Sequence, residues 1–127
     1  DQEPFRNLFP TDPADPDYNE EVAREGEYAA AEENEKMLRF FHNADILIHD
    51  AQYTETEYAA KIGWGHASHE QAVDNALKAG AKKLVLTHHD PARTDEQLEK
   101  LEKICRAGSR DKGLEIIMAR EGISLEA

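Results

Sequence analysis

Histidine and aspartate side chains recur at three points in this sequence, each at the end of a short apolar run or in a turn. They are His49 and Asp50 in IHDA, His66 in GHAS, and His88, His89 and Asp90 in THHDP. Imidazole and carboxylate groups are common ligands of zinc, iron and manganese, and they also transfer protons during hydrolysis. A carboxylate beside a histidine can fix the imidazole tautomer and raise its basicity. The pattern therefore indicates a metal-binding or acid–base site.

Each of these residues alone also has an ordinary structural explanation. A single histidine after a strand is more often a hydrogen-bonded loop residue than a ligand, and Asp50 fits a turn cap equally well. His66 could simply stabilise the start of the helix that follows it. We expect His69 to face solvent. Trp64 and Tyr53 are expected to pack in the protein rather than to stack on a substrate. A functional site is favoured because three coincidences would otherwise be needed.

Two apolar runs predict the strands that would carry these residues. Residues 44–51 and 83–87 are short, apolar and bounded by polar residues, which is typical of buried strands. Polar residues at the ends of such strands are where α/β folds place ligands. Residues 53–65 are expected to form a loop, and residues 114–119 and 122–127 a terminal hairpin or two edge strands.

Three helices are predicted around these strands. They cover residues 20 to about 42, residues 68–79 with Gln71 as capping-box partner, and residues 94–106 with Gln97 in the same role. The alternation of helices and buried strands places the chain in the α/β class. The buried stripe of the first helix is predicted to comprise Val22, Tyr28 or Ala29, Ala31, Met37, Leu38 and Phe41.

Composition limits the classes of partner. The 127 residues suit one domain or part of a larger one, and a formal net charge of −12 argues against broad electrostatic wrapping of nucleic acid. A nucleotide substrate in a small metal-loaded pocket remains compatible with this charge, because the ions would supply positive charge.

The single cysteine, Cys105, makes no internal disulfide, so a reducing cytoplasm is expected. No apolar run is long enough for a membrane span. Residues 1–19 are acidic and rich in proline, which predicts an irregular arm.

The order of four motifs resembles the C-terminal half of a metallo-β-lactamase-fold hydrolase. The motifs are DQEP, LIHDAQYTETEY, GWGHAS and LVLTHHDP, and together they span nearly the whole chain. Within that superfamily the sequence is similar to the branch that includes ribonuclease Z and the phosphoribosyl cyclic-phosphate diesterases. The resemblance implies an αβ/βα sandwich, with residues 1–127 as the C-terminal part of one domain. It also implies two divalent metal ions at one edge, zinc first, with manganese or iron as alternatives.

The resemblance implies roles for individual residues as well. Asp1 of DQEP matches the aspartate that bridges the two metals, and His88 of THHDP matches the last metal-binding histidine. His66 of GHAS matches a catalytic histidine near the scissile phosphate. Asp50 stands where ribonuclease Z has a glutamate, and it would orient and charge His66, which then stabilises the phosphorane or protonates the leaving oxygen. Three further residues would only support these groups: His49, His89 and Asp90.

One departure from the family pattern is large. The sequence contains no His-x-His, so the principal ligand motif HxHxDH is absent, and a further upstream histidine is absent too. Asp1 and His88 alone do not make a dinuclear centre. Because the sequence begins without methionine at the expected bridging aspartate, we expect a missing N-terminal half of the same domain to supply the other ligands. Half a sandwich would leave one sheet face uncovered, so we expect pairing with that half or with a second copy of the chain.

These observations favour a metal-dependent hydrolase. The leading hypothesis is a phosphodiesterase for a small or cyclic nucleotide-type phosphodiester, active only with the N-terminal half, since these residues hold no basic segment that would grip tRNA. A thioester or lactam hydrolase of the same fold is the alternative among enzymes. A non-catalytic interaction or oligomerisation fragment is the alternative from another class, and the presence or absence of HxHxDH in the intact protein would decide between them.

Overall fold

The computed structural model describes residues 2–127. Asp1, the predicted bridging metal ligand, lies outside the described residues. The chain divides into two units: the larger comprises Phe41–Ala127 with Gln2 and Glu3, and the smaller is Pro4–Phe40. No helix within the described part of the chain is long and apolar enough to cross a membrane.

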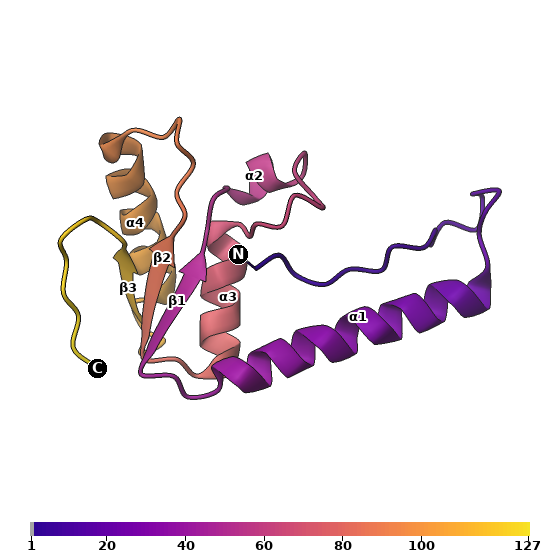
Figure 1. Cartoon of the computed structure of the whole chain (residues 1–127), viewed down its shortest axis with the longest axis horizontal. Helices are drawn as coiled ribbons and strands as arrows, with labels where there is room; N and C mark the ends of the chain where they lie inside the picture. Colours follow the sequence, from indigo (N-terminus) through magenta and orange to yellow (C-terminus); the bar gives the residue numbers. More distant parts are fainter. Residues whose placement is uncertain (1) are drawn as a thin grey trace. The chain divides into compact units, whose positions relative to one another are not determined.

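A three-stranded parallel sheet is the centre of the larger unit (Figure 1). Its strands lie side by side in the order β1 (Ile46–Asp50), β2 (Lys83–Thr87) and β3 (Glu115–Met118). The register pairs Asp50 with Thr87, so β1 and β2 end at the same edge of the sheet. The parallel sheet confirms the α/β class. It also brings the segments that follow β1 and β2 together, as the sequence predicts.

Of the predicted terminal hairpin or two edge strands, one edge strand is confirmed, because β3 lies within residues 114–119, and the hairpin is wrong. Residues 122–127 form no strand, and β3 runs parallel to β2. The helix before β3 returns the chain to the edge where β2 begins, and a strand that follows such a crossover pairs in parallel. The last residues form a tail, in which the Glu126 carbonyl accepts a hydrogen bond from Lys83 Nζ at 2.7 Å.

Two helices of the larger unit begin where the sequence predicts. They are α3 (His69–Ala79) and α4 (Asp95–Ser109). The Ser68 hydroxyl accepts from Gln71 N while the Gln71 side chain accepts from Ser68 N, and Thr94 with Gln97 repeats the arrangement. Each box satisfies amide groups that a helix start leaves without an intrahelical partner. Both predicted capping boxes are therefore confirmed.

A short helix, α2 (Glu55–Tyr58), lies where the sequence analysis predicts only a loop. It begins with a third capping box, in which Thr54 and Glu57 hold each other's backbone amides. The Glu57 carboxylate also accepts from Arg93 Nη2 at 2.7 Å. A Thr-x-x-Glu spacing was thus a readable signal for this helix, although four residues are too few for apolar periodicity to reveal it.

The core of the larger unit lies between the sheet and helices α3 and α4. Alternate strand residues face these helices, and they include Leu47, Leu84, Leu86, Ile116 and Met118. Ala72 and Ala76 of α3 are fully buried, and these small side chains allow the helix to approach the strands closely. On the other face of the sheet, Ile48 is 66% exposed. One face is therefore packed, while the other presents an apolar residue of β1.

Each of the three strands is entered through a residue in the left-handed region. These residues are Asn43 with φ 55°, Gly80 with φ 71° and Gly113 with φ 72°. Gly80 is also the C-cap of α3, where the missing Cβ removes the usual steric cost. Tight turns therefore precede all three strands at the amino edge of the sheet. The longer connections lie at the carboxyl edge.

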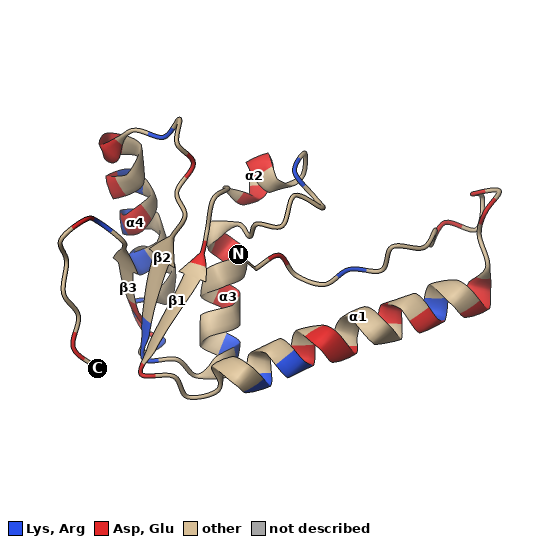
Figure 2. Ribbon diagram, in the orientation of Figure 1, with Lys and Arg blue, Asp and Glu red and all other residues tan. Residues whose placement is uncertain are grey.

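The smaller unit consists of an irregular arm and nearly all of α1 (Glu20–Phe41). The helix has the predicted extent, but its predicted buried stripe is only partly confirmed, because Met37, Leu38 and Phe41 near its end are half-buried while its earlier members are exposed. Ala23 is the buried residue of α1, whereas Val22 and Tyr28 are exposed. Acidic residues recur along α1 (red in Figure 2) and leave only a narrow apolar stripe.

Polar contacts join the arm to α1. Asn34 exchanges two hydrogen bonds with the backbone of Phe5, and Asn7 Nδ2 donates to the Ala23 carbonyl at 2.8 Å. The arm packs closely against Gly26. A Cβ at this position would come within 2.8 Å of the Phe9 ring and closer still to Asn7. The glycine is therefore needed for close approach of the arm and does not break the helix.

Candidate active site at the carboxyl edge of the sheet

Three of the predicted site residues meet at the carboxyl edge of the sheet. Asp50 is the last residue of β1, His88 directly follows β2, and His66 lies in the segment before α3. The His66 and His88 rings stack with their centroids 4.3 Å apart and their planes at 21°. His66 Nδ1 lies 3.5 Å from Asp50 Oδ2. Parallel pairing of β1 and β2 produces this cluster, because it places the ends of both strands together.

Asp50 is buried, and backbone amides surround its carboxylate. Oδ1 accepts a short hydrogen bond from Gln2 N, and Oδ2 accepts one from Ala67 N at 2.9 Å. Such bonds offset the cost of removing a carboxylate charge from water. The 3.5 Å to His66 is an ion-pair distance, longer than an ordinary hydrogen bond. Asp50 can therefore both orient the His66 imidazole and hold the backbone next to it.

His88 adopts an uncommon backbone conformation, with φ at 57°. Residues other than glycine rarely occupy the left-handed region, and those that do cluster at functional sites. Here the conformation turns the chain sharply at the end of β2 and presents the imidazole to His66. The strain of this residue is consistent with a role for its side chain at the site.

The loop before His66 is bound by one carboxylate. Glu3 accepts hydrogen bonds from the Tyr58 hydroxyl at 2.9 Å, Gly63 N at 2.6 Å and Gly65 N at 2.8 Å. Glu3 is not among the candidate residues that the sequence motifs indicate. The only available signal was its position in DQEP, two residues after the predicted ligand Asp1.

Two aromatic residues near this loop have different environments. Tyr53 is buried, as expected for a packing residue. Trp64 is 62% exposed, so the expectation that it packs in the protein is wrong. Lys61 Nζ lies 3.8 Å from the centroid of the Trp64 ring, a cation–π contact at the surface. Gly63 and Gly65 flank Trp64 and supply no side chains of their own to cover its ring.

His49 supports the fold rather than facing the site. Its Nδ1 donates to the Asp50 carbonyl at 2.7 Å, and its Nε2 accepts from Asn75 Nδ2 at 3.3 Å. Burial lowers the pKa of His49, which keeps the imidazole neutral. His49 therefore holds the end of β1 against α3, and any effect of His49 on the site passes through Asp50.

His69 is buried, so the expectation that it faces solvent is wrong. Its Nδ1 lies 2.5 Å from the Tyr53 carbonyl, and burial lowers its pKa from 6.5 to about 4. The first turn of α3 lies against the segment after β1, since Tyr53 and Ser68 form an isolated parallel bridge. This tertiary contact, which helical position alone does not reveal, covers the imidazole.

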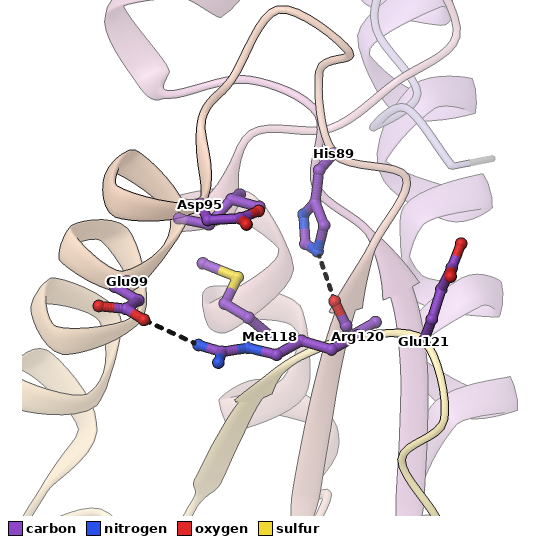
Figure 3. Close-up of a pocket in the computed structure, with 8 residues that line it drawn as sticks. His89, Asp95, Glu99, Met118, Arg120 and Glu121 are labelled. Carbon is purple, nitrogen blue, oxygen red and sulfur yellow. Dashed lines mark hydrogen bonds and ion pairs between the residues drawn. The ribbon is translucent and has the colours of Figure 1, made fainter.

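The side chains of His89 and Asp90 make hydrogen bonds away from His66. The Asp90 carboxylate accepts from Ala92 N at 2.8 Å and thus builds the turn before α4. His89 lines a cavity of about 410 Å³ beside β3 and α4, together with Asp95, Glu99, Met118 and Arg120 (Figure 3). Its Nε2 donates to the Ala119 carbonyl at 3.1 Å. Their predicted support of the metal ligands stays a prediction.

The described residues do not make a metal centre by themselves. Among residues 2–127, no group of three or more histidine, cysteine, aspartate or glutamate side chains is placed to hold a metal ion. His88 is the one predicted ligand within this range, and Asp50 uses both carboxylate oxygens on backbone amides. The donor set of this chain therefore fits a share of a metal site, and the rest would have to come from elsewhere.

Comparisons with known proteins agree with the resemblance read from the motifs. No protein-family model matches the chain. Ribonuclease Z of Exiguobacterium sibiricum is 40% identical over 72 residues, covering 57% of this chain and 24% of that protein. Ribonuclease Z of Bacillus velezensis is 37% identical over 87 residues, covering 68% of this chain and 27% of that protein. The matched region thus spans about a quarter of the length of these curated relatives.

A solved structure extends the agreement to the fold. The metallo-β-lactamase fold protein YhfI from Bacillus subtilis superposes with a TM-score of 0.53 and 25% identity, over 69% of this chain and 33% of that one. These similarities confirm the predicted resemblance to the ribonuclease Z-like branch and show that the chain has part of a metallo-β-lactamase fold.

Proposed function

We propose that this chain, which has part of a metallo-β-lactamase fold and resembles ribonuclease Z, is one part of a metal-dependent phosphodiesterase. The observation that carries the proposal is the cluster of Asp50, His66 and His88 at the carboxyl edge of the sheet. The similarity to proteins named ribonuclease Z supports phosphodiester cleavage over other hydrolytic reactions. The proposal includes an N-terminal half of the same domain, because the described residues supply too few metal ligands.

In this proposal His66 is the proton donor to the leaving oxygen. Asp50 Oδ2 lies 3.5 Å from His66 Nδ1, so the carboxylate can orient the imidazole for the transfer. The proton held on His66 would pass to the alkoxide as the phosphorus–oxygen bond breaks, and water would later restore it. Stacking on His88 restricts the tilt of the His66 ring, so the donor stays oriented toward the edge of the sheet.

His88 and Asp1 would be the two metal ligands from this chain. The cofactor would be two divalent ions, zinc first, with manganese or iron as alternatives, and it would supply positive charge to the phosphoryl oxygens and acidify water. The exposed His88 imidazole fits a ligand role. The remaining ligands would come from the N-terminal half, which would also cover the sheet face that presents Ile48.

A small or cyclic nucleotide-type phosphodiester is the proposed substrate. The chain carries a net charge of −12, and a long polyanion would meet this charge at many points, whereas a small phosphodiester meets only the pocket. Trp64 adds an exposed ring two residues before His66, suited to stack on a nucleobase. The proposed location is the cytoplasm, and the proposed assembly includes the N-terminal half or a homodimer.

The experiment combines metal analysis with turnover in the complete protein. We expect about two metal equivalents and hydrolysis of 2′,3′-cyclic AMP, with His66→Ala lowering kcat by roughly 10²- to 10⁴-fold while metal content stays the same. His42→Ala is the matched control, because His42 is exposed at the end of α1. Loss of the metals from His66→Ala would show that His66 is a ligand and that the role assignment is wrong.

A non-catalytic interaction fragment is the second candidate. It is favoured by the lack of a complete metal-binding group among residues 2–127. This function predicts that the purified complete protein binds no zinc or manganese even after incubation with either ion. Such a result, together with no hydrolysis of any phosphodiester, would replace the enzyme proposal.

A further inference from the structure

Glu3 joins the N-terminal segment to the loop that carries His66. Oε1 of its carboxylate accepts from both the Tyr58 hydroxyl and Gly63 N, and Oε2 accepts from Gly65 N. Hydrogen bonds to a charged acceptor are about twice as strong as neutral ones. Tyr58 is 1% exposed, so the network is anchored in the packed interior of the larger unit.

Besides Glu3, the loop is held by backbone hydrogen bonds from Lys61 N to the Tyr58 carbonyl at 2.7 Å and from Trp64 N to the Lys61 carbonyl at 3.1 Å. Gly63 and Gly65 have φ values of 87° and 88°, and a Cβ at either position would have no atom within 4 Å. Trp64 and Ile62 are both exposed, so burial of their side chains does not fix the loop. Two amides of such a turn that point at one anion form a backbone nest. The Glu3 carboxylate, rather than side-chain burial, therefore ties the two glycine amides of this loop to the larger unit.

His66 stands between two backbone amides that are bound to carboxylates. On one side Gly65 N donates to Glu3, and on the other Ala67 N donates to Asp50. Gln2 N donates to Asp50 as well, so the adjacent residues Gln2 and Glu3 are tied to both sides of His66. The backbone that orients the His66 imidazole is thus bound by two carboxylates, and Asp50 also approaches the ring itself.

We propose that Glu3 is a positioning residue, which acts through Gly63 and Gly65 to hold His66 at the site without touching the substrate. The inference rests on the proposed function of His66 as proton donor. Proton transfer requires the donor to lie within hydrogen-bond reach of the leaving oxygen, so a small displacement of the loop lowers the rate strongly. The loss is greatest for a poor leaving group, such as an alkoxide, which needs the proton most.

Three substitutions in the complete, zinc-loaded protein remove increasing numbers of the hydrogen bonds to Glu3. Tyr58→Phe removes one hydrogen bond and leaves both glycine amides bound. Glu3→Gln retains one acceptor oxygen but places an NH₂ group where Gly65 N needs an acceptor, and Glu3→Ala removes every acceptor. Glu96→Gln makes the same change of charge at an exposed position in the first turn of α4, and is the matched control.

Two substrates separate a proton-donor effect from general damage. For 2′,3′-cyclic AMP, whose leaving group is an alkoxide, we expect kcat to fall by roughly 10- to 100-fold in Glu3→Ala, less in Glu3→Gln and least in Tyr58→Phe, with KM nearly unchanged. For bis(p-nitrophenyl) phosphate, with its good leaving group, the fall should be no more than about 3-fold. Adding Glu3→Ala to His66→Ala should cause no further loss on the cyclic substrate, because both act on one step.

A spectroscopic measurement tests the same inference independently of turnover. Trp64, the single tryptophan of these residues, reports directly on the loop. Its fluorescence anisotropy should fall in Glu3→Gln and Glu3→Ala and stay unchanged in Glu96→Gln.

Unchanged anisotropy and unchanged kcat in Glu3→Ala would overturn the inference. Equal losses on both substrates that add to those of His66→Ala would overturn it too, since Glu3 would then serve only the general fold. If the unsubstituted zinc-loaded protein hydrolyses neither phosphodiester, the proposed function fails first, and the catalytic part of this inference fails with it. A failure of the inference alone instead leaves the unsubstituted protein active.

Discussion

The two units of this chain place their apolar residues in opposite environments. In the larger unit, Leu84, Leu86 and Ile116 lie within the core between the sheet and its helices. In the smaller unit, Leu8 is 92% exposed and Tyr28 is 72% exposed. Both units contain well-formed helices, so helix formation and core formation are separate properties. A helix needs favourable local sequence, whereas a core needs a second apolar surface to pack against.

Charge separates the two units as well. Pro4–Phe40 contains ten acidic and four basic residues, which amounts to half of the net charge of the whole sequence in less than a third of its length. Its ion pairs, such as Lys36 with Glu32 and Arg39 with Glu35, lie one helical turn apart on exposed side chains. Pairs of this kind support a helix locally and contribute little to stability. The larger unit therefore holds most of the folding free energy.

Leu86→Ala should show the largest effect on stability. Leu86 is fully buried in the core of the larger unit, so truncation leaves a cavity and should lower the free energy of unfolding by about 2–5 kcal/mol. Urea denaturation followed by circular dichroism measures the change. Leu8→Ala makes the same truncation on the smaller unit and should change the value by less than about 0.5 kcal/mol. Equal effects of the two substitutions would abolish the contrast between the units.

Acid should destabilise the larger unit through His69. The folded chain keeps this imidazole neutral down to a pKa of about 4, whereas the unfolded chain protonates it near 6.5. The unfolded state therefore binds more protons between these values, and stability falls as the pH drops from 6.5 toward 4. The loss in the free energy of unfolding from this titration is at most about 3 kcal/mol, at roughly 1.4 kcal/mol per unit of pKa.

A variant isolates this effect from other titrations. His69→Gln keeps a hydrogen-bond donor for the Tyr53 carbonyl but has no proton to gain, so its stability should depend less on pH across this window. Pro4–Phe40 contains no histidine, and its helix content should not respond to this titration. Identical pH profiles of the variant and the unsubstituted protein would contradict the assignment.

Removal of a helix cap should have an intermediate effect. Ser68→Ala deletes the acceptor for Gln71 N and a hydrogen bond to Glu55, and it should lower the free energy of unfolding by about 1 kcal/mol. Ser68→Asn keeps a side-chain oxygen for the cap and should recover part of the loss. A Ser68→Ala variant with unchanged stability would show that the sheet contacts hold α3 without its cap.

The smallest effect is expected within α1. Tyr28→Ala replaces an exposed side chain by the residue most favourable to helices, so the free energy of unfolding should change by less than about 0.5 kcal/mol. The same denaturation experiment measures it. A loss above about 2 kcal/mol would show that Tyr28 is covered in the folded protein and that the smaller unit has a core after all.

The elements that the sequence predicted well carry local signals. Ser68 with Gln71 marks the start of α3, and the apolar run 83–87 coincides with β2. The cluster of Asp50, His66 and His88 could also be predicted, because parallel strands bring their carboxyl ends together. In each case the decisive information lies within a few residues of sequence, or in a rule of sheet topology.

The elements that the sequence did not predict depend on distant contacts. His69 is buried because the segment after β1 covers it, and Glu3 gains its importance from amides sixty residues away. Ala23 of α1 is buried where the arm contacts the helix. Residues 122–127 have strand-like composition but pair with no strand of the sheet. Partners far along the chain decide these features, and short-range patterns do not contain them.

The turns and the candidate site lie at opposite edges of the sheet, which leaves the edge with the turns available for labelling. Asn43, Gly80 and Gly113 return the chain at one edge, whereas Asp50 and His88 stand at the other. A fluorophore or a cross-linker attached to the exposed Lys82, beside Gly80, would therefore sit a strand's length from the chemistry. The same edge offers a site for immobilising the protein on a surface while substrate still reaches the opposite one.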